Sequence, residues 1–429
     1  MTDTAPARSA ALDLLDAVLS KRRPLDDAIV DHAGLARLET RDRAFARLLV
    51  ATTLRRLGQI DAAIDHFLAK PLPARARIAR QILRLGACQL LFLDTPPHAA
   101  VDSAVALAGA RTSRPFKGLV NALLRRLAGE GSTLVAAHDA ARLNTPDWLW
   151  QRWTVTYGET VARAIANAHL AEPTLDITVK DDAAGWAARL DASRLPTGTL
   201  RRPLGGPVTG LPGYDDGAWW VQDAASALPA RLLGDVSGAT VFDLCAAPGG
   251  KTAQLAAAGA RVVAVDRKHR LGRLRENLAR LGLDAETVAA DLTQWRPERP
   301  AECVLLDAPC SATGTIRRHP DVARIKRIAE IGRFAALQER LLATALDALA
   351  PGGLLVYCVC SLEPEEGPAH IEALLARDSS MVREPITASE VYGLAELIDA
   401  RGDLRTLPSH LAEHGGLDGF YAARLKRLA

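Results

Sequence analysis

From residue 239 onward the sequence alternates between short strand-like runs and longer helix-like stretches, and this alternation limits the possible fold more than any other feature. The runs are rich in Val, Leu and Ala and cover residues 241–244, 262–266, 287–291, 304–307 and 354–358. Helix-like stretches around residues 251–258, 271–281 and 331–349 separate them. This order is typical of an α/β domain with a doubly wound, mainly parallel sheet. Because such sheets bind ligands beyond the carboxyl ends of their strands, we expect functional residues where the strands end.

The part of the chain before residue 140 has a different period. Between residues 9 and 127 apolar residues recur at helical spacing, as with Leu12, Leu15 and Leu19, and strand-like alternation is absent. Residues that stop helices or form turns divide this region at Pro24, Gly58, Pro71 to Pro73, Pro96 and Pro97. The pattern predicts an all-α bundle.

Residues 141–215 are mixed. A tryptophan-rich helical stretch with Trp148, Trp150 and Trp153 leads into an alternating segment at residues 175–180 and then into Gly- and Pro-rich sequence. We interpret this part as a small α/β module or linker. The tryptophans either anchor one domain on another or stack on bases.

Charge is unevenly distributed along the 429 residues. The net charge is +3, yet residues 1–140 hold 20 basic and 14 acidic residues, a net charge of +6. An anionic partner such as nucleic acid is one explanation for this excess, and an ordinary solvated surface is the other. The same two interpretations apply to two local basic groups, namely Arg114, Lys117, Arg125 and Arg126, and Arg317, Arg318, Arg324, Lys326, Arg327 and Arg333.

Several classes of protein are excluded. No apolar run approaches the roughly 20 residues that cross a bilayer. Asp3, Asp13 and Asp16 interrupt the first twenty residues, which argues against a secretory signal and leads us to expect a cytoplasmic protein. Six cysteines are too few for a disulfide scaffold, although five of them lie between Cys245 and Cys360.

A loop of small residues follows the first strand-like run and leads directly into a helix. It comprises Cys245, Ala246, Ala247, Pro248, Gly249, Gly250 and Lys251. The glycine spacings of a dinucleotide fingerprint and of a phosphate-binding P-loop are both absent. Asp266, Asp291 and Asp307 close the next three runs, where they either cap helices or accept hydrogen bonds from a nucleoside. S-adenosylmethionine has a ribose and an adenine but no phosphate, so these residues favour it as the cofactor.

Cysteines lie where the fourth and fifth runs end. Cys310 follows Asp307, and Cys358 and Cys360 end the fifth run. Methyl transfer to carbon 5 of cytosine requires a thiolate that first adds to carbon 6, and a carboxylate such as Asp307 is suited to hold the N3 edge of the ring. A zinc site is disfavoured because the spacing of Cys358 and Cys360 is too tight and further ligands are missing, and we expect no metal. Cys88, Cys245 and Cys303 are explained as core residues.

These motifs resemble those of the bacterial Fmu/Sun (RsmB/NOP) family of S-adenosylmethionine-dependent RNA cytosine-C5 methyltransferases. Residues 243–252 resemble the family's cofactor loop, residues 307–314 its first cysteine motif, and residues 359–361 its second. The family commonly has Ser-Thr before the second cysteine, whereas this chain has Cys358 and Val359. Residues 85–91, 97–101 and 121–125 resemble the NusB-like domain of the branch that modifies small-subunit ribosomal RNA.

The resemblance implies a role for each matching residue. Cys360 would be the nucleophile, Cys310 would assist product release, and Asp307 would act beside them. Residues 245–251, Asp266, Asp291 and Asp307 would line the cofactor site. RNA would be held by the helical domain and by Arg317, Arg318, Arg324, Lys326 and Arg327.

The resemblance also implies a domain order. It comprises a NusB-like all-α RNA-binding domain at 1–140, a small α/β module at 141–215 and a Rossmann-like class I methyltransferase domain at 216–429, in a protein that we expect to be a monomer. The predicted function is methylation of carbon 5 of a cytosine in small-subunit (16S) ribosomal RNA through a covalent bond between Cys360 and carbon 6. Two other hypotheses remain open at this point, namely Cys310 as the nucleophile and an RNA-binding assembly factor without turnover.

Overall fold

The computed structural model describes residues 5–111 and 113–429 and divides the chain into two compact units. The first is formed by the described part of Met1–Leu170 together with Arg318–Lys326, and the second by Ala171–Arg317 and Arg327–Ala429. The sequence-based domain boundaries at residues 140 and 215 therefore differ from the division in the structure. The small module is split, with its tryptophan-rich helices in the first unit and its strands in the second.

The first unit is helical, as the spacing of apolar residues predicts. Its helices are α1 (Ala5–Lys21), α2 (Leu25–Val30), α3 (Ala33–Ala36), α4 (Thr40–Arg55), α5 (Leu57–His66), α6 (Arg77–Phe92), α7 (Pro97–Ala110), α8 (Lys117–Ala136), α9 (Ala140–Asn144), α10 (Asp147–Tyr157), α11 (Glu159–Ala168) and α16 (Val322–Ile325). Helices α1, α4, α6 and α8 bury Leu12, Leu15, Leu49, Leu83 and Leu124 in one core. Burial of these side chains stabilises the bundle by roughly 1.5–3 kcal/mol each.

The prediction from the sequence that Gly58 separates two helices is wrong. Gly58 lies inside α5, and a Cβ built on it would lie 1.7 Å from the carbonyl oxygen of Leu143. The glycine is needed because α5 and α9 approach closely at this point. The break between α4 and α5 falls at Arg56 instead.

The second unit begins with a small antiparallel sheet in the strand order β2-β3-β1-β4. Its strands are β1 (Leu175–Val179), β2 (Ser193–Arg194), β3 (Leu200–Arg202) and β4 (Trp219–Val221), and α12 (Ala183–Arg189) connects β1 to β2. Strand β1 confirms the strand expected from the alternating segment at 175–180. Ile177, Leu200 and Trp219 are buried and form the core of this sheet.

The larger sheet has the order β10-β12-β9-β8-β5-β6-β7, and β11 pairs with β12. Strands β5 (Thr240–Leu244), β6 (Arg261–Asp266), β7 (Glu286–Ala289), β8 (Ala301–Asp307) and β9 (Leu349–Val359) are parallel, which confirms the doubly wound sheet. Strands β10 (Met381–Arg383), β11 (Leu404–Thr406) and β12 (Phe420–Arg427) add antiparallel pairs at the β9 edge. The short helix α13 (Leu228–Arg231) precedes β5.

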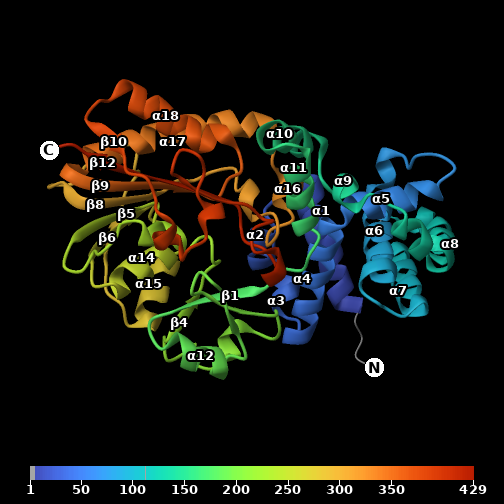
Figure 1. The fold of residues 1–429 in the computed structure, drawn as a ribbon. Helices are drawn as coiled ribbons and strands as arrows, with labels where there is room; N and C mark the ends of the chain where they lie inside the picture. The colour runs from blue at the N-terminus through green and yellow to red at the C-terminus, as the bar shows by residue number, and fades with distance from the viewer. Residues whose placement is uncertain (1–4, 112) are drawn as a thin grey trace. The chain divides into compact units, whose positions relative to one another are not determined.

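Helices cover both faces of the larger sheet. Helices α14 (Gly250–Ala257) and α15 (Leu271–Leu281) lie on one face, and α17 (Ile328–Asp347) and α18 (Pro368–Arg377) lie on the other (Figure 1). Leu274 and Leu278 of α15 pack with Ala264 of β6, whereas Leu341 and Leu342 of α17 pack on the opposite face. Both faces of the parallel strands are therefore buried, which explains why their sequences are almost continuously apolar.

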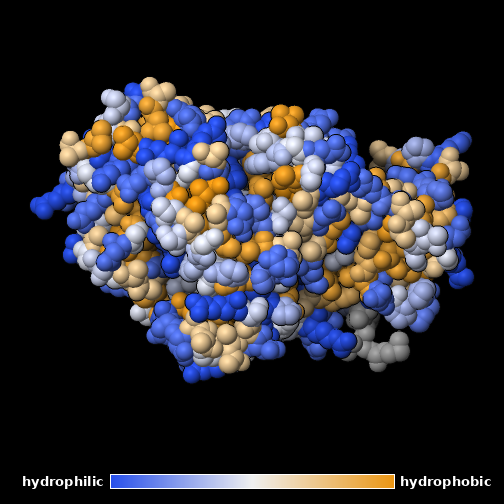
Figure 2. Space-filling model, in the orientation of Figure 1, coloured by the Kyte–Doolittle hydropathy of each residue, from blue (hydrophilic) through white to orange (hydrophobic). Residues whose placement is uncertain are grey.

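Among the described residues, no helix is long and apolar enough to cross a bilayer. On the face drawn in space-filling form, hydrophilic and hydrophobic residues are interspersed in small groups (Figure 2).

Candidate functional site

The loops after β5, β8 and β9 meet at one edge of the larger sheet. Leu244 lies beside Leu306 in the parallel register, and Asp307 lies beside Cys358. The chain leaves β8 and β9 at adjacent positions, so the cysteine motifs that are fifty residues apart in the sequence are close in space. This is the edge at which the sequence predicts the functional residues.

The loop after β5 bends through conformations that favour small residues. Cys245 and Gly249 have φ angles of 63° and 102°, and Gly249 caps the N-terminus of α14. Asp266 at the end of β6 accepts hydrogen bonds from the backbone N–H groups of Ala247 at 2.9 Å and Arg267 at 2.7 Å. Asp266 therefore fixes the loop through its carboxylate in addition to lining the cavity beside it.

A cavity of about 200 Å³ lies against this loop. It brings together three of the predicted cofactor residues, Cys245, Asp266 and Asp291, and is completed by Arg267, Arg270, Ala290, Leu292, Thr293, Pro309, Phe334, Leu337 and Leu341. Asp291 lies two residues beyond β7 rather than in it. Hydrogen bonds from Thr293 lower the pKa of Asp291, so it is an ionised acceptor.

The cavity fits S-adenosylmethionine in its chemistry. Two carboxylates offer acceptors for hydroxyl and amino groups, while Leu337, Leu341 and Phe334 offer an apolar wall for a nucleobase. The predicted residues Ala246, Ala247, Pro248, Gly249, Gly250, Lys251 and Asp307 do not line it.

The sulfur atoms of Cys310 and Cys360 are 3.4 Å apart, within hydrogen-bond distance. The hydrogen bond with Cys360, together with burial, raises the pKa of Cys310 well above its usual value. Cys310 therefore stays protonated and is suited to donate its S–H to a thiolate at Cys360.

Asp307, the last residue of β8 and three residues before Cys310, holds Lys251. The ammonium nitrogen of Lys251 is 2.7 Å from Oδ2 of Asp307 and 3.1 Å from the hydroxyl of Ser226. Burial opposes the charged form of Lys251, but the ion pair with Asp307 outweighs it and raises its pKa. The sequence places Lys251 only in the cofactor loop, and its contact with Asp307 becomes visible when α14 and β8 are seen together.

Cys358 has a different environment from the sulfur pair. Its side chain is fully buried, and its thiol lies 3.6 Å from Oδ1 of Asp307. Burial raises the pKa of Cys358 well above its usual value, which makes it a poor nucleophile.

Sequence reasoning missed Glu366, a fully buried residue that bonds to both Ser311 and Ser361. Each serine follows one of the paired cysteines. A glutamate shortly after a cysteine motif, in a stretch that also contains Glu363 and Glu365, is easily interpreted as a solvated acidic turn. Its burial in the structure distinguishes Glu366 from a residue of such a turn.

The five residues predicted to bind RNA after Cys310 differ in burial and are divided between the two units. Arg317 is fully buried in the second unit, where its guanidinium bonds to Asp223 at 2.8 Å and Asp418 at 3.5 Å. The prediction that Arg317 contacts RNA is therefore corrected, because this side chain holds loops together inside the unit.

The other four residues differ in exposure and in unit. Arg324 lies in the first unit and donates to the carbonyl oxygens of Leu54 and Asn144. Burial lowers the pKa of Arg324 to about 10. Arg318 and Lys326 are half-buried in the same unit, and Arg327 is exposed in the second unit.

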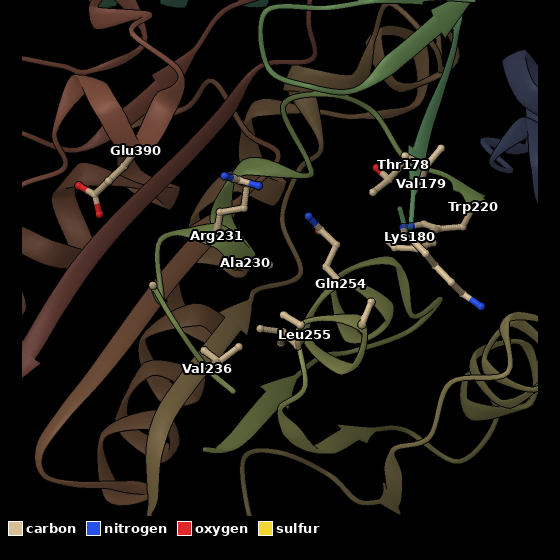
Figure 3. A pocket seen from close by; sticks show the side chains of 13 residues that line it. Thr178, Val179, Lys180, Trp220, Ala230, Arg231, Val236, Gln254, Leu255 and Glu390 are labelled. Carbon is tan, nitrogen blue, oxygen red and sulfur yellow. The ribbon is translucent and has the colours of Figure 1, made fainter. Parts of the chain in front are cut away.

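A second cavity, of about 470 Å³, lies between the small sheet and helices α13 and α14. Lys180, Arg231 and Gln254 are among the polar side chains around it (Figure 3). It contains none of the predicted site residues. Within the described residues, no group of three or more His, Cys, Asp or Glu side chains is arranged to hold a metal ion.

Comparison with known families assigns both halves of the chain. Residues 230–426 match the family model described as 16S rRNA methyltransferase RsmB/F, and residues 5–129 match that of the NusB family. The fold and the site thus define a Rossmann-like methyltransferase domain preceded by a NusB domain, which confirms the predicted fold class.

Individual relatives extend this match over almost the whole chain. Ribosomal RNA small subunit methyltransferase B of Pseudomonas syringae pv. tomato is 38% identical, covering 98% of this chain and 97% of its own. The chain belongs to the RsmB/F family of 16S rRNA methyltransferases, and its cofactor is S-adenosylmethionine, as the sequence predicts.

Solved structures share the fold. The crystal structure of PH0851 has a TM-score of 0.76 at 22% identity and covers 100% of this chain and 99% of its own. A methyltransferase homologue from Pyrococcus horikoshii has a TM-score of 0.53 at 28% identity and covers 65% of this chain and 94% of its own.

Proposed function

We propose that this protein methylates carbon 5 of a specific cytosine in 16S ribosomal RNA, with Cys360 as the nucleophile. The observation that carries the proposal is the pair of thiols, Cys310 and Cys360, with sulfurs 3.4 Å apart just beyond the point where the paired registers of β8 and β9 end at Asp307 and Cys358. Carbon 5 of cytosine is a poor nucleophile. A thiolate that adds to carbon 6 forms an S–C6 bond and shifts the π electrons of the C5=C6 bond, so the ring becomes an enamine with a nucleophilic carbon 5.

The cofactor is held by residues of the β5 loop and by Asp266 and Asp291. S-adenosylmethionine, when bound, supplies an electrophilic methyl group. The carboxylates of Asp266 and Asp291 orient its nucleoside, and Cys245 is the residue of the β5 loop that lines the cavity. Phe334 and Leu341 form an apolar wall on one side of the cavity.

Asp307 and Lys251 act on the target ring. The carboxylate of Asp307, held by its ion pair with Lys251, accepts a hydrogen bond from the exocyclic amino group of cytosine. The ammonium of Lys251 stabilises the negative charge that builds on the ring when the thiolate adds. This refines the expectation that Asp307 holds the N3 edge.

Cys310 completes the cycle. A hydroxide or water molecule from solvent takes the proton from carbon 5, the electron pair of that C–H bond re-forms C5=C6, and Cys360 leaves as a thiolate. The protonated thiol of Cys310, with its sulfur 3.4 Å from that of Cys360, donates a hydrogen bond that stabilises the departing thiolate.

Ribosomal RNA is held in part by the helical unit. Arg114, Lys117 and Arg125 are exposed around the start of α8 and provide positive charge for phosphates. The target base is displaced from its stack to reach the cysteine pair.

Three variants of the two cysteines and one mapping experiment test the proposal. Cys360→Ser is expected to abolish methylation of 16S RNA, and Cys310→Ala is expected to accumulate a covalent RNA adduct on a denaturing gel when cofactor is present. Bisulfite sequencing of ribosomal RNA from cells lacking the gene should show the loss of one cytosine signal. If Cys310→Ala abolishes methylation while Cys360→Ala retains it, Cys310 is the nucleophile and the assignment is wrong.

A further inference from the structure

The cysteine loops are joined by one buried carboxylate. Oε1 of Glu366 accepts a hydrogen bond from the backbone N–H of Ser311 at 2.8 Å. Oε2 accepts from the hydroxyl groups of both Ser311 and Ser361. Glu366 is fully buried, and both serine hydroxyls belong to buried residues, so solvent does not weaken these bonds.

These bonds occur where the sheet no longer holds the chain. The paired registers of β8 and β9 end at Asp307 and Cys358, before either cysteine of the pair. Beyond that point two backbone bonds connect the segments, from Ala308 N–H to the Cys358 carbonyl at 2.9 Å and from Gly314 N–H to the Cys360 carbonyl at 3.1 Å. The hydroxyl of Thr313, the 3.2 Å contact between the hydroxyls of Ser311 and Ser361, and Glu366 add to them. Glu366 is the charged member of this set.

Glu366 is itself fixed from two sides. The hydroxyl of Tyr357 on β9 donates to the Glu366 carbonyl at 2.7 Å. Gln338 on α17 donates to the carbonyl of Pro309 at 2.9 Å and lies 3.4 Å from Oε1 of Glu366. His370 contacts the oxygen of the same amide at 3.1 Å. The carboxylate therefore has a defined position relative to both segments.

We propose that Glu366 is a positioning residue that holds the sulfurs of Cys310 and Cys360 in contact by accepting hydrogen bonds from the serine that follows each cysteine. The proposal rests on the proposed function, since contact matters only if both thiols take part in the reaction. A carboxylate is suited to this task because it accepts from several donors at once. An amide at the same place brings an N–H₂ group against two hydroxyl donors.

The first test measures the sulfur contact without RNA. Alkylation of each cysteine by iodoacetamide is followed by mass spectrometry across a pH series in the full chain. In the wild type, Cys310 is expected to titrate well above an ordinary thiol, because its hydrogen bond with Cys360 and its burial raise its pKa. In Ser361→Ala that midpoint is expected to fall. Each pH unit by which it falls should increase the alkylation of Cys310 at pH 8 about tenfold.

Ser361→Ala is the decisive variant because it keeps the charge of Glu366, which also raises the pKa of Cys310. A fall in the midpoint there reports separation of the sulfurs and not loss of a neighbouring charge. Glu366→Gln is expected to lower the midpoint further. Glu365→Gln, which changes the exposed neighbour, is the matched control and is expected to titrate like the wild type.

The second test is kinetic. Ser361→Ala and Glu366→Gln are expected to lower kcat by about 10- to 100-fold while the KM for S-adenosylmethionine and its calorimetric Kd stay unchanged, because misplacement of reacting groups by 1 Å costs up to that factor. Circular dichroism confirms folding, and Ser311→Ala replaces Glu366→Gln if the latter does not fold.

The outcomes separate this proposal from the proposed function. If the wild-type Cys310 midpoint is ordinary, or if Ser361→Ala leaves it unchanged while kcat falls, Glu366 does not hold the sulfurs together and the proposal is wrong. If Cys360→Ser still methylates RNA, the proposed function fails, whereas the titration still reports whether Glu366 controls the contact.

Discussion

Asp243 is a buried acid whose ionisation opposes folding. Its side chain has no exposed surface, Oδ2 accepts from Thr252 at 2.6 Å, and burial raises its pKa to about 7. An unfolded Asp titrates near pH 4, so between about pH 4 and 7 the unfolded chain loses this proton first and the free energy of unfolding falls as pH rises. Above pH 7 the cost is constant.

Asp243→Asn is therefore expected to raise stability at pH 8, by on the order of 1–4 kcal/mol, and to change it little at pH 4. The amide keeps an acceptor for Thr252 and stays neutral at every pH. Urea unfolding at the two pH values measures the difference. A gain of equal size at both pH values contradicts the assignment of the effect to ionisation.

Cys358 and Cys360 differ in environment although they are two residues apart. Cys358 is fully buried against Asp307, whereas Cys360 contacts Cys310. Cys358→Ala is expected to retain methylation within about threefold, while Cys360→Ala loses at least about 10³-fold, as expected for a nucleophile. Transfer of a radiolabelled methyl group to RNA measures both. The opposite ranking would assign the chemistry to Cys358.

At the scale of elements, the hydrophobic pattern of the sequence is sufficient to predict the positions of the strands that are buried on both faces. Strands β5, β6, β8 and β9 lie within a few residues of their expected positions. Strand β12 was missed because it contains Arg424, which is buried and bonds to Glu390 and to the carbonyls of Leu232 and Pro385. Strands β10 and β11 have three residues each, too few for a period to appear.

For the candidate site, the sequence predicts which loops come together but not the contacts between their side chains. Strand ends and cysteine spacing identify which loops gather, because parallel neighbours must end at the same edge. They do not identify the ion pair of Lys251 with Asp307, the hydrogen bonds of Glu366 or the burial of Arg317, since each depends on packing between elements far apart in the sequence.

Gly314 joins the first cysteine segment to the start of β12. A Cβ on it would lie 1.8 Å from the carbonyl oxygen of Gly419, which is backbone and has no rotamer with which to avoid contact. Gly314→Ala is expected to destabilise the protein by about 2–3 kcal/mol or more and to reduce methylation, because Gly314 also bonds to Cys360.

Gly272→Ala is the matched control for this variant. Gly272 lies in α15, and nothing lies within 4 Å of its Cβ position. Alanine there is expected to stabilise by about 0.5–1 kcal/mol. Thermal unfolding followed by circular dichroism compares the two, and equal midpoints for the two variants contradict the predicted close approach at Gly314.

At the scale of the whole molecule, the chain crosses between its two units more than once. Residues 318–326 leave the second unit and pack in the first, where Ile325 joins the helical core and Asp321 accepts from the backbone N–H of Leu25 at 3.0 Å. The segment that resembles a basic RNA-binding stretch in the sequence is thus partly a structural component of the helical bundle.

Arg324→Ala tests this assignment in the full chain. The variant removes the hydrogen bonds from Arg324 to the Leu54 and Asn144 carbonyls. A hydrogen bond to a charged group contributes about 1.5–3 kcal/mol to the free energy of unfolding. Hydrogen exchange by mass spectrometry is expected to show faster exchange in α4 and α9 and unchanged exchange in the larger sheet. Arg333→Ala, at an exposed position of α17, is the control. Unchanged exchange in α4 would show that Arg324 does not support the bundle.

The helical unit carries the remaining exposed charge suited to RNA. Replacing Arg114, Lys117 and Arg125 by alanine is expected to weaken binding of 16S RNA and to reduce the slope of log Kd against log salt by about two. Each phosphate of single-stranded RNA that the variant no longer neutralises contributes roughly 0.7 to this slope. Filter binding at several salt concentrations measures this slope.

Binding of S-adenosylmethionine should not change, because these residues lie in the other unit from the cofactor cavity. Arg299→Ala removes an exposed arginine from the methyltransferase unit and is expected to change the slope by less than about one. If the triple variant keeps the wild-type slope, the NusB domain of this enzyme does not hold RNA through these side chains.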